Sequence, residues 1–497
     1  MNRTLVILLI TGWFVLSGQV PRPHSPVLTD SYLVESIKMP EGLRPVTGAM
    51  EFLPDGRLIA CFLRGEVMTY DPATKKWTLF AEGLQEPLGM LVISNAEIIV
   101  MQRPELTRIT DTDGDGHADL FETVTDDFGI SGNYHEFNYG PVKDKQGNLF
   151  FGLNTASSNG NIRKEVRGKL DTSTLNQKGQ MFSAVPYRGW IMKLTPKGSL
   201  LPFASGFRSP NGLGFDLEGN LFATDNQGDW VGTSALYQVV QGKFYGHPAS
   251  LVWQKNWKRG SPYEVPLPEL EQMRTRASVL FPHGIIANSP TQPRCDGTNG
   301  KFGPFAGQFF IGEMNQERII RVMLEEVDGA LQGACIPFIT RKGLRKGNNR
   351  LAFAPDGSLW VGQAQEQAWT GDEGIQRIVF TGKNPVEIYN MHLTSTGFDL
   401  SFTEPLDEST LANPANYKFK RYFYEYHKKY GSDQFDIQEI PVTNIKVSQD
   451  GKKVSLSLQS LKPGYVYELN LTNIRTTKGQ HLENNLICYT LNKLNRK

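Results

Sequence analysis

The sequence predicts an all-β protein: a six-bladed β-propeller followed by a small β-sandwich of the immunoglobulin or fibronectin type. The composition is one reason, because 11% aromatic residues with 49 Gly and 29 Pro are typical of short strands joined by tight turns. The second reason is a strand–turn–strand pattern that returns along most of the chain. The third is the length of 497 residues, which exceeds one small core at ~150 residues per domain.

The charge balance excludes one class of function. Lys and Arg number 52 against 51 Asp and Glu, which gives a formal net charge of +1. Binding to nucleic acid through the phosphate backbone depends on an excess of basic residues, so no nucleic-acid partner is expected.

The N-terminal residues 1–19 are predicted to be a secretory signal peptide. Arg3 precedes an apolar run from Leu5 to Leu16, and small residues follow at Ser17 and Gly18. We therefore expect a secreted or periplasmic protein. The run is shorter than the ~20 residues that span a bilayer, so the mature protein is not expected to be membrane-spanning. A retained N-terminal anchor is the alternative.

The propeller is predicted over residues 30–382 from a repeated unit of apolar residues, a polar turn with Gly and an alternating strand. Six copies begin at Met50, Pro87, Tyr139, Leu213, Gly307 and Leu351. One such sheet cannot bury both faces, whereas six in a ring can. Long insertions at 154–188 and 250–300 are expected to build a pocket. A β-sandwich with the same turns is the alternative.

Residues 383–497 are predicted to form the second domain, because alternating strands with Asp-Gly and Pro-Gly turns fill ~110 residues, the size of an immunoglobulin-like sandwich. Its aromatic stretch from Tyr417 to Gly431 suits either a carbohydrate-stacking surface or core and domain interface.

Four cysteines, Cys61, Cys295, Cys335 and Cys488, are too far apart for a zinc knuckle or the CxxCH attachment of a c-type haem. A disulfide between Cys295 and Cys335 is one expectation, and buried free thiols are the other.

The segment DTDGDGHADLFE, residues 111–122, has the oxygen-ligand spacing of an EF-hand loop. The carboxylates occupy positions 1, 3, 5, 9 and 12, and position 7 offers only a backbone carbonyl. These positions are held by Asp111, Asp113, Asp115, Asp119 and Glu122, with His117 at position 7. The flanking residues do not have a helical pattern, so we expect a structural Ca²⁺ loop between propeller strands. A solvated acidic turn is the alternative.

Polar clusters occur at comparable points of successive repeats, where the funnel of a propeller lies. They are residues 134–136, 208–212, 225–229, 244–248, 282–284 and 346–350.

These segments carry a resemblance to a known family. His135 ahead of KDKQGNLFFG, the segment GFRSPNGLGFDLEGNLFATDNQGD and the later GKFYGHP and NRLAFAPDGSLWVGQ are similar to successive blades of the glucose/sorbosone dehydrogenase family. The likeness covers about residues 40–382 and is greatest for secreted bacterial propellers that are often fused to a c-type cytochrome. It implies six blades and oxidation of a sugar or sugar aldehyde with pyrroloquinoline quinone.

The resemblance also implies roles for individual residues. His135 matches the general base of the family, and a histidine suits proton removal at neutral pH. Arg208 and Asn211 stand at its Arg-Asn-Pro-Gln-Gly cofactor motif, where Ser209 and Asn211 depart from the pattern. Arg350 and Lys346 lie near its late basic pair, so all four are candidates for cofactor binding. Tyr245, Asp225 and Asn226 are candidates for substrate binding, although capping a strand end is another role for Asp225 and Asn226.

Three functions are consistent with this sequence. The first is an exported oxidoreductase that acts on a carbohydrate or alcohol and passes electrons to a separate c-type cytochrome. The second is a lyase or hydrolase in which His135 and Tyr245 act as base and acid. The third is a non-catalytic module that binds glycan.

Overall fold

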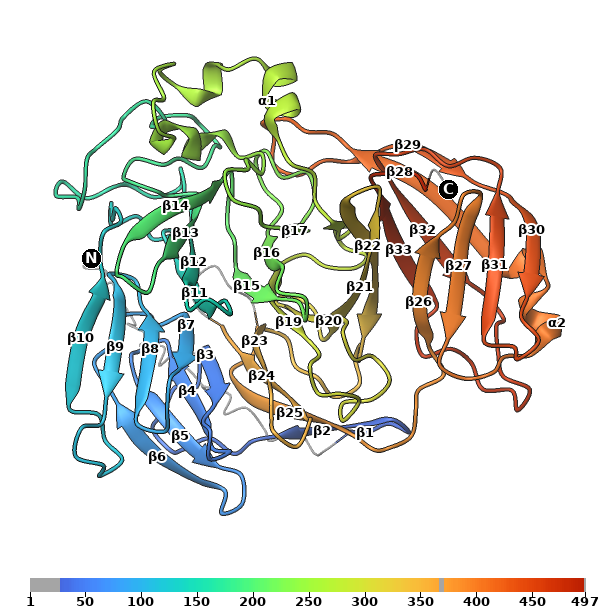
Figure 1. Ribbon diagram of the computed structural model, residues 1–497, viewed down its shortest axis with the longest axis horizontal. Coiled ribbons are helices and arrows are strands. Elements are labelled where there is room, and N and C mark those ends of the chain that lie inside the picture. Colours follow the sequence, from blue (N-terminus) through green and yellow to red (C-terminus); the bar gives the residue numbers. More distant parts are fainter. Residues whose placement is uncertain (1–26, 366–370, 496–497) are drawn as a thin grey trace, which may run out of the picture.

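The computed structural model describes residues 27–365 and 371–495, which form a propeller with a β-sandwich at one side (Figure 1). The signal peptide expected at residues 1–19 lies outside the described residues. Within the described ranges, no helix has the length and apolar character needed to cross a membrane.

The first three blades are four-stranded antiparallel sheets in which each strand pairs with its neighbour in sequence. Blade 1 comprises β3 (Thr47–Phe52), β4 (Leu58–Phe62), β5 (Val67–Asp71) and β6 (Lys76–Ala81). Blade 2 comprises β7 (Gly89–Val92), β8 (Glu97–Met101), β9 (Leu106–Thr110) and β10 (Leu120–Thr125). Blade 3 comprises β11 (Asn138–Lys143), β12 (Leu149–Leu153), β13 (Trp190–Leu194) and β14 (Leu200–Ser205).

Blades 4 to 6 complete the ring. Blade 4 comprises β15 (Gly212–Phe215), β16 (Leu221–Asp225), β17 (Ala235–Gln238) and β18 (Val279–Leu280), and between the last two lie η1 (Pro248–Trp253), η2 (Pro262–Glu264) and α1 (Leu267–Met273). Blade 5 comprises β19 (Pro290–Cys295), β20 (Phe309–Glu313), β21 (Ile319–Val327) and β22 (Ala330–Phe338). Blade 6 comprises β23 (Asn348–Phe353), β24 (Leu359–Gln363) and β25 (Gly374–Phe380), completed by β2 (Tyr32–Ser36) and β1 (Val27–Leu28).

The blades close into a ring around their innermost strands. Each innermost strand contacts the next, from β3 through β7, β11, β15 and β19 to β23, and β23 contacts β3 again. The N-terminal strand β2 pairs with β25, with Tyr32 opposite Phe380, so the two ends of the propeller sequence share blade 6. The ring structure confirms the propeller part of the predicted fold class.

The repeated polar turn connects strands of the same blade, as the Met50 copy shows. Gly56 has a φ of +91°, a conformation that glycine adopts without steric cost, and its N–H donates to the carbonyl of Leu53. The copy that begins at Gly307 covers β20 and β21, the second and third strands of blade 5 counted from the channel. The other copies begin on or just before the innermost strand of their blade. The innermost strand of blade 5 is Pro290–Cys295, inside the segment expected to be an insertion.

The C-terminal residues form two sheets that pack around a common apolar core. One sheet comprises β26 (Ile388–Leu393), β27 (Gly397–Phe402), β31 (Lys453–Leu458) and β30 (Val442–Val447). The other comprises β33 (Leu486–Leu491), β32 (Tyr465–Leu471), β28 (Tyr417–Tyr424) and β29 (Gln434–Glu439). The short helices α2 (Glu408–Leu411) and η3 (Pro414–Asn416) precede β28. The sandwich part of the fold class is thus confirmed, and its immunoglobulin- or fibronectin-like type stays a prediction.

Blade 5 and the sandwich share one sheet. Strand β22 pairs with β33, and Met323 and Ile336 of blade 5 belong to the sandwich core. In Figure 1 the orange and red strands of the sandwich continue from β21 and β22. The two domains are therefore joined by backbone hydrogen bonds as well as by the connecting chain.

The cysteines are thiols in the structure. The expected bond between Cys295 and Cys335 is not formed, because Cys335 lies on β22 directly opposite Cys488 of β33. Cys295 instead donates to the carbonyl of Gly307 at 3.4 Å. The alternative of free thiols is the one that the structure has, with Cys61, Cys335 and Cys488 buried.

Candidate functional site

His135 lies on the loop that leads into β11, and a buried ion pair fixes this loop. The neighbouring Glu136 accepts hydrogen bonds from the backbone N–H and the hydroxyl of Ser131, at 2.8 and 2.7 Å. The buried Arg188 donates to the carbonyl of Gly129 and lies 3.9 Å from Glu136. The backbone on both sides of His135 is therefore held by buried polar contacts.

The imidazole of His135 is in the state that a general base requires. Its Nδ1 lies 2.9 Å from the carbonyl oxygen of Thr155, which can only accept, so Nδ1 carries the proton and Nε2 has a free lone pair. No described residue is hydrogen-bonded to Nε2, and the side chain is half-buried. Burial, reinforced by the positive charge of Arg208, lowers the pKa of His135 to about 4. The ring is therefore neutral at physiological pH.

Arg208 is tied to the same threonine. The N–H and the hydroxyl of Thr155 donate to the carbonyl of Arg208, at 3.1 and 2.7 Å. Asp225 at the end of β16 accepts from the backbone N–H groups of Arg208 and Ser209, at 2.8 and 2.6 Å. Thr155 thus joins the end of β12 to the start of β15 and keeps His135 and Arg208 together.

The guanidinium of Arg208 is held at one edge. Its Nε donates to Asp229 at 2.9 Å, and among the described residues no acceptor lies at its two terminal nitrogens. A Cβ at Gly228 would lie 1.9 Å from this Nε, so only glycine leaves room for the guanidinium there. The terminal N–H groups remain available to an anionic or hydroxyl-bearing ligand.

Asp229 connects Arg208 to a buried histidine. Its second carboxylate oxygen lies 3.0 Å from Nε2 of His247 and accepts from the backbone N–H of Met181 at 2.7 Å. Although burial acts in the opposite direction, His247 and Arg208 hold the pKa of Asp229 well below its usual range. A fully ionised carboxylate therefore fixes the position of Arg208.

The central channel of the ring is filled by Arg350 from β23. Its guanidinium donates to backbone carbonyls of Gly48, Leu88 and Asn211, which come from blades 1, 2 and 4, at 2.8 to 3.3 Å. It also lies 5.0 Å from the ring of Tyr139 in blade 3. These contacts describe a residue that joins the blades rather than one that faces a ligand.

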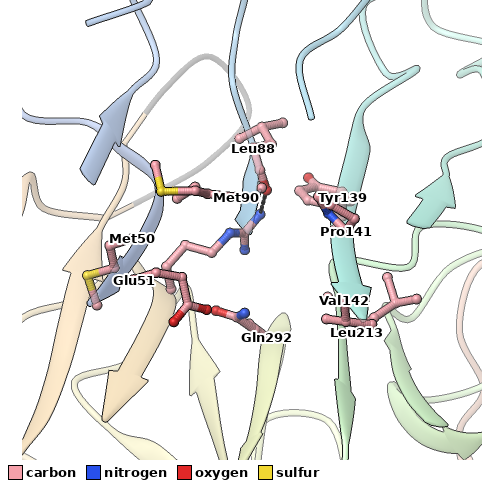
Figure 2. A pocket seen from close by; sticks show the side chains of 14 residues that line it. Met50, Glu51, Leu88, Met90, Tyr139, Pro141, Val142, Leu213 and Gln292 are labelled. Carbon is pink, nitrogen blue, oxygen red and sulfur yellow. Dashed lines mark hydrogen bonds between the residues drawn. The ribbon is translucent and has the colours of Figure 1, made fainter. Parts of the chain in front are cut away.

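The remaining space in the channel is small. The cavity has a volume of about 20 Å³, about enough for one water molecule. Figure 2 shows its wall, with Tyr139 on one side and Glu51 and Gln292 next to each other on another. A ligand pocket typically has a volume of ~300 Å³ or more, so this channel is too small to hold a sugar or a quinone.

The other predicted site residues lie in different surroundings. Tyr245 is buried, stacks on Phe207 at 4.7 Å and donates its hydroxyl to the carbonyl of Gln238 at 2.6 Å. The side chain of Lys346 is exposed at the rim of blade 6. Asn211 and Asn226 have side-chain carbonyl oxygens that are buried and receive no hydrogen bond from the described residues. Asp225 caps the start of the Arg208 segment, and burial raises its pKa to about 6.

The acidic loop joins β9 and β10 at the outer edge of blade 2. Carboxylate oxygens of Asp111, Asp113 and Asp115 lie within 4.8 Å of one another. Asp119 instead accepts from the backbone N–H and the hydroxyl of Thr112, at 3.0 and 2.6 Å. The exposed Glu122 lies on β10 opposite Arg108, and His117 has an exposed side chain. Three of the five predicted carboxylates are therefore assembled.

Sequence reasoning missed Thr155 and Asp229 as parts of the site. Thr155 follows β12 without any motif, and only the fold brings it to His135. Asp229 had a signal, because it ends the segment Asp225–Asp229 of polar residues after β16. Its spacing from Asp225 does not reveal that it pairs with Arg208.

This chain is similar to several known proteins. A model for a domain of unknown function, DUF7133, matches residues 66–265. No curated protein matches the chain. The quinone domain of pyranose dehydrogenase from Coprinopsis cinerea, solved in its holo form, is 12% identical with a TM-score of 0.50, over 72% of this chain and 98% of that one. The PQQ-bound aldose sugar dehydrogenase from Streptomyces coelicolor is 16% identical with a TM-score of 0.46, over 70% and 98%. At such identity, the pyranose dehydrogenase domain supports the propeller fold of this chain.

Proposed function

We propose that the protein is an oxidoreductase that oxidises a sugar or a related alcohol at the rim of the propeller, with His135 as general base. The observation that carries this proposal is the state of His135, whose Nδ1 is committed to Thr155 while Nε2 is free and the ring is neutral. Oxidation of an alcohol requires removal of the hydroxyl proton, and a free lone pair on Nε2 can accept it.

The residues at the rim suit a planar quinone that carries carboxylates. Arg208 has terminal N–H groups free to bind a carboxylate. Pyrroloquinoline quinone, when bound, supplies an acceptor for the two electrons of alcohol oxidation. The holo structure of the pyranose dehydrogenase domain, which has the same fold, is in accord with this choice.

His135 would carry a positive charge after accepting the proton. The carbonyl of Thr155 keeps its hydrogen bond to Nδ1 in both states, so the ring does not have to reorient. The low pKa favours prompt release of this proton to solvent, since His135 is half-buried rather than enclosed.

The lyase or hydrolase alternative has less support. It required Tyr245 as the acid, and the hydroxyl of Tyr245 donates to Gln238 and accepts from the N–H of Val240 inside blade 4. Burial raises the pKa of this phenol above its ordinary value, which makes it a weaker proton donor.

The remaining parts of the proposal concern Ca²⁺, export and the electron acceptor. We propose that Asp111, Asp113 and Asp115 bind a structural Ca²⁺, because three close carboxylates repel one another without a cation. We also propose export by the apolar N-terminus and electron transfer to a separate c-type cytochrome.

The test is dye reduction by the purified protein with Ca²⁺ and pyrroloquinoline quinone across a panel of sugars. We expect turnover with the unaltered protein and loss of at least about 100-fold in kcat with His135→Ala. His481→Ala, which replaces an exposed histidine of the sandwich, is the control and should leave turnover unchanged. Absence of dye reduction with every sugar, at saturating quinone, would contradict the proposal.

A further inference from the structure

A loop of the sandwich lies on the propeller beside the candidate site. This loop, residues 426–432 between β28 and β29, follows the edge of the 228–232 segment of blade 4. The N–H of Gly431 donates to Gly228 at 2.9 Å, and the N–H of Ser432 donates to Gly232 at 2.8 Å. In the other direction, the N–H of Trp230 donates to His427 at 3.1 Å. Backbone bonds therefore fix the loop against the segment that contains Asp229.

Three further contacts hold the loop from its sides. Gln180, on the long insertion of blade 3, donates to the carbonyl of Lys428 at 2.8 Å. Tyr426 packs against Trp230, with ring centroids 5.4 Å apart, and the guanidinium of Arg274 lies 4.6 Å from the same ring. The loop is thus anchored to blades 3 and 4 together.

This anchoring places the ring of Tyr430 against the guanidinium of Arg208. The guanidinium carbon of Arg208 lies 5.4 Å from the centre of the Tyr430 ring, while Asp229 occupies the edge of the guanidinium. Tyr430 as a whole residue is 68% exposed. Hydrophobic burial therefore does not explain why an aromatic side chain stands at position 430, because an exposed ring gains little from the hydrophobic effect.

We propose that Tyr430, a residue of the sandwich, forms part of the sugar-binding surface of the propeller site. This inference rests on the proposed function and names its substrate class as a pyranose sugar. The C–H groups on one face of a pyranose carry a partial positive charge, and the electron-rich face of Tyr430 suits them. The guanidinium of Arg208 lies over one face of this ring, so the pyranose would pack on the opposite face. The active site is then built from both domains.

The test compares steady-state kinetics and calorimetric binding of Tyr430→Ala and Tyr430→Phe with the unaltered protein. D-Glucose, D-galactose, D-xylose and maltose are the probes. For Tyr430→Ala we expect KM and the Kd of the bound sugars to rise about 5- to 10-fold with kcat within 2-fold, since a stacking contact stabilises ground and transition states alike. Tyr430→Phe keeps the ring and should remain within 2-fold. Tyr389→Ala, an exposed tyrosine of β26, is the matched control.

The outcomes separate this inference from the proposed function. Sugar binding that Tyr430→Ala weakens, without any dye reduction, would support Tyr430 and contradict the oxidoreductase. Turnover with KM unchanged in Tyr430→Ala would overturn the role of Tyr430 alone. A fall in kcat with a displaced pH profile would overturn it too, because Tyr430 would then act only by holding Arg208. No binding of any probe by the unaltered protein would overturn both.

Discussion

The pKa of His135 gives the proposed base a distinctive pH dependence. An unperturbed histidine has a pKa of about 6.5, whereas burial and the charge of Arg208 lower that of His135 to about 4. The ring is active when neutral, so activity should persist as the pH falls to about 5 and decline through about 4. We expect the acidic limb of the kcat/KM profile at that pH. A limb near 6.5 would show that the ring is not in this environment.

Removal of the positive charge of Arg208 should move the acidic limb of the kcat/KM profile to higher pH. In Arg208→Gln the pKa of His135 should rise towards 6.5, because Arg208 no longer opposes protonation and Asp229 favours it. An NMR titration of the labelled imidazole measures the shift even if the variant has lost activity. Arg64→Gln, at an exposed position of blade 1, should leave the titration unchanged.

Arg350 is expected to matter for stability. Arg350→Ala would leave the carbonyls of Gly48, Leu88 and Asn211 without their donor in the closed channel, and we expect a loss of about 2–4 kcal/mol in the free energy of unfolding. Urea unfolding measures this loss, with Arg64→Ala as the control. Unchanged stability would indicate that the channel admits water or a ligand in place of the side chain.

At the scale of elements, the hairpin of blade 2 provides the test of Ca²⁺. A chelator should lower the melting temperature of the protein, because a cation that binds only the folded loop stabilises it. Asp113→Asn should abolish most of this dependence, since Asp113 is one of the three assembled carboxylates. Asp127→Asn, an exposed acidic residue near the same sheet, is the matched control. An identical melting temperature with and without chelator would indicate that residues 111–122 form a solvated turn without bound Ca²⁺.

The elements that were predictable from the sequence are those with a local signal. The Asp-Gly turns and alternating strands identified hairpins in all six blades, because turn geometry and period-2 burial are local properties. The copy at Gly307 predicts β20 as the innermost strand of blade 5, whereas the innermost strand is β19. The repeated pattern cannot distinguish the hairpin β19–β20 from the hairpin β20–β21. The pairing of β2 with β25 and of β22 with β33 had no local signal, as both depend on residues more than 100 positions apart.

The candidate site was predictable only in part, for the same reason. His135 and Arg208 were found through their positions before β11 and β15, and the fold does bring them together through Thr155. Tyr245 and Arg350 have suitable chemistry, yet their hydrogen-bond partners are backbone groups of the core and channel, which a sequence does not reveal. Tyr430 reaches Arg208 from another domain.

At the scale of the whole molecule, the shared sheet predicts that the propeller depends on the sandwich. A chain that ends after residue 382 would leave β22 with an unpaired edge and would expose Met323 and Ile336. We expect this truncated chain to self-associate, as measured by size-exclusion chromatography, because an open apolar edge invites strand pairing. Ala334→Lys on that edge should reduce the association. A monodisperse truncated propeller would contradict this expectation.

The strand Tyr32–Ser36 also determines when the ring can be completed. Its partner in blade 6 ends at Phe380, so a ribosome must make nearly all of the propeller before the first strand finds its place. Until β2 pairs with β25, the ring stays open and blade 6 lacks its outer strands β2 and β1. Because β2 and β25 are about 340 residues apart, this long-range pairing is expected to form late in folding.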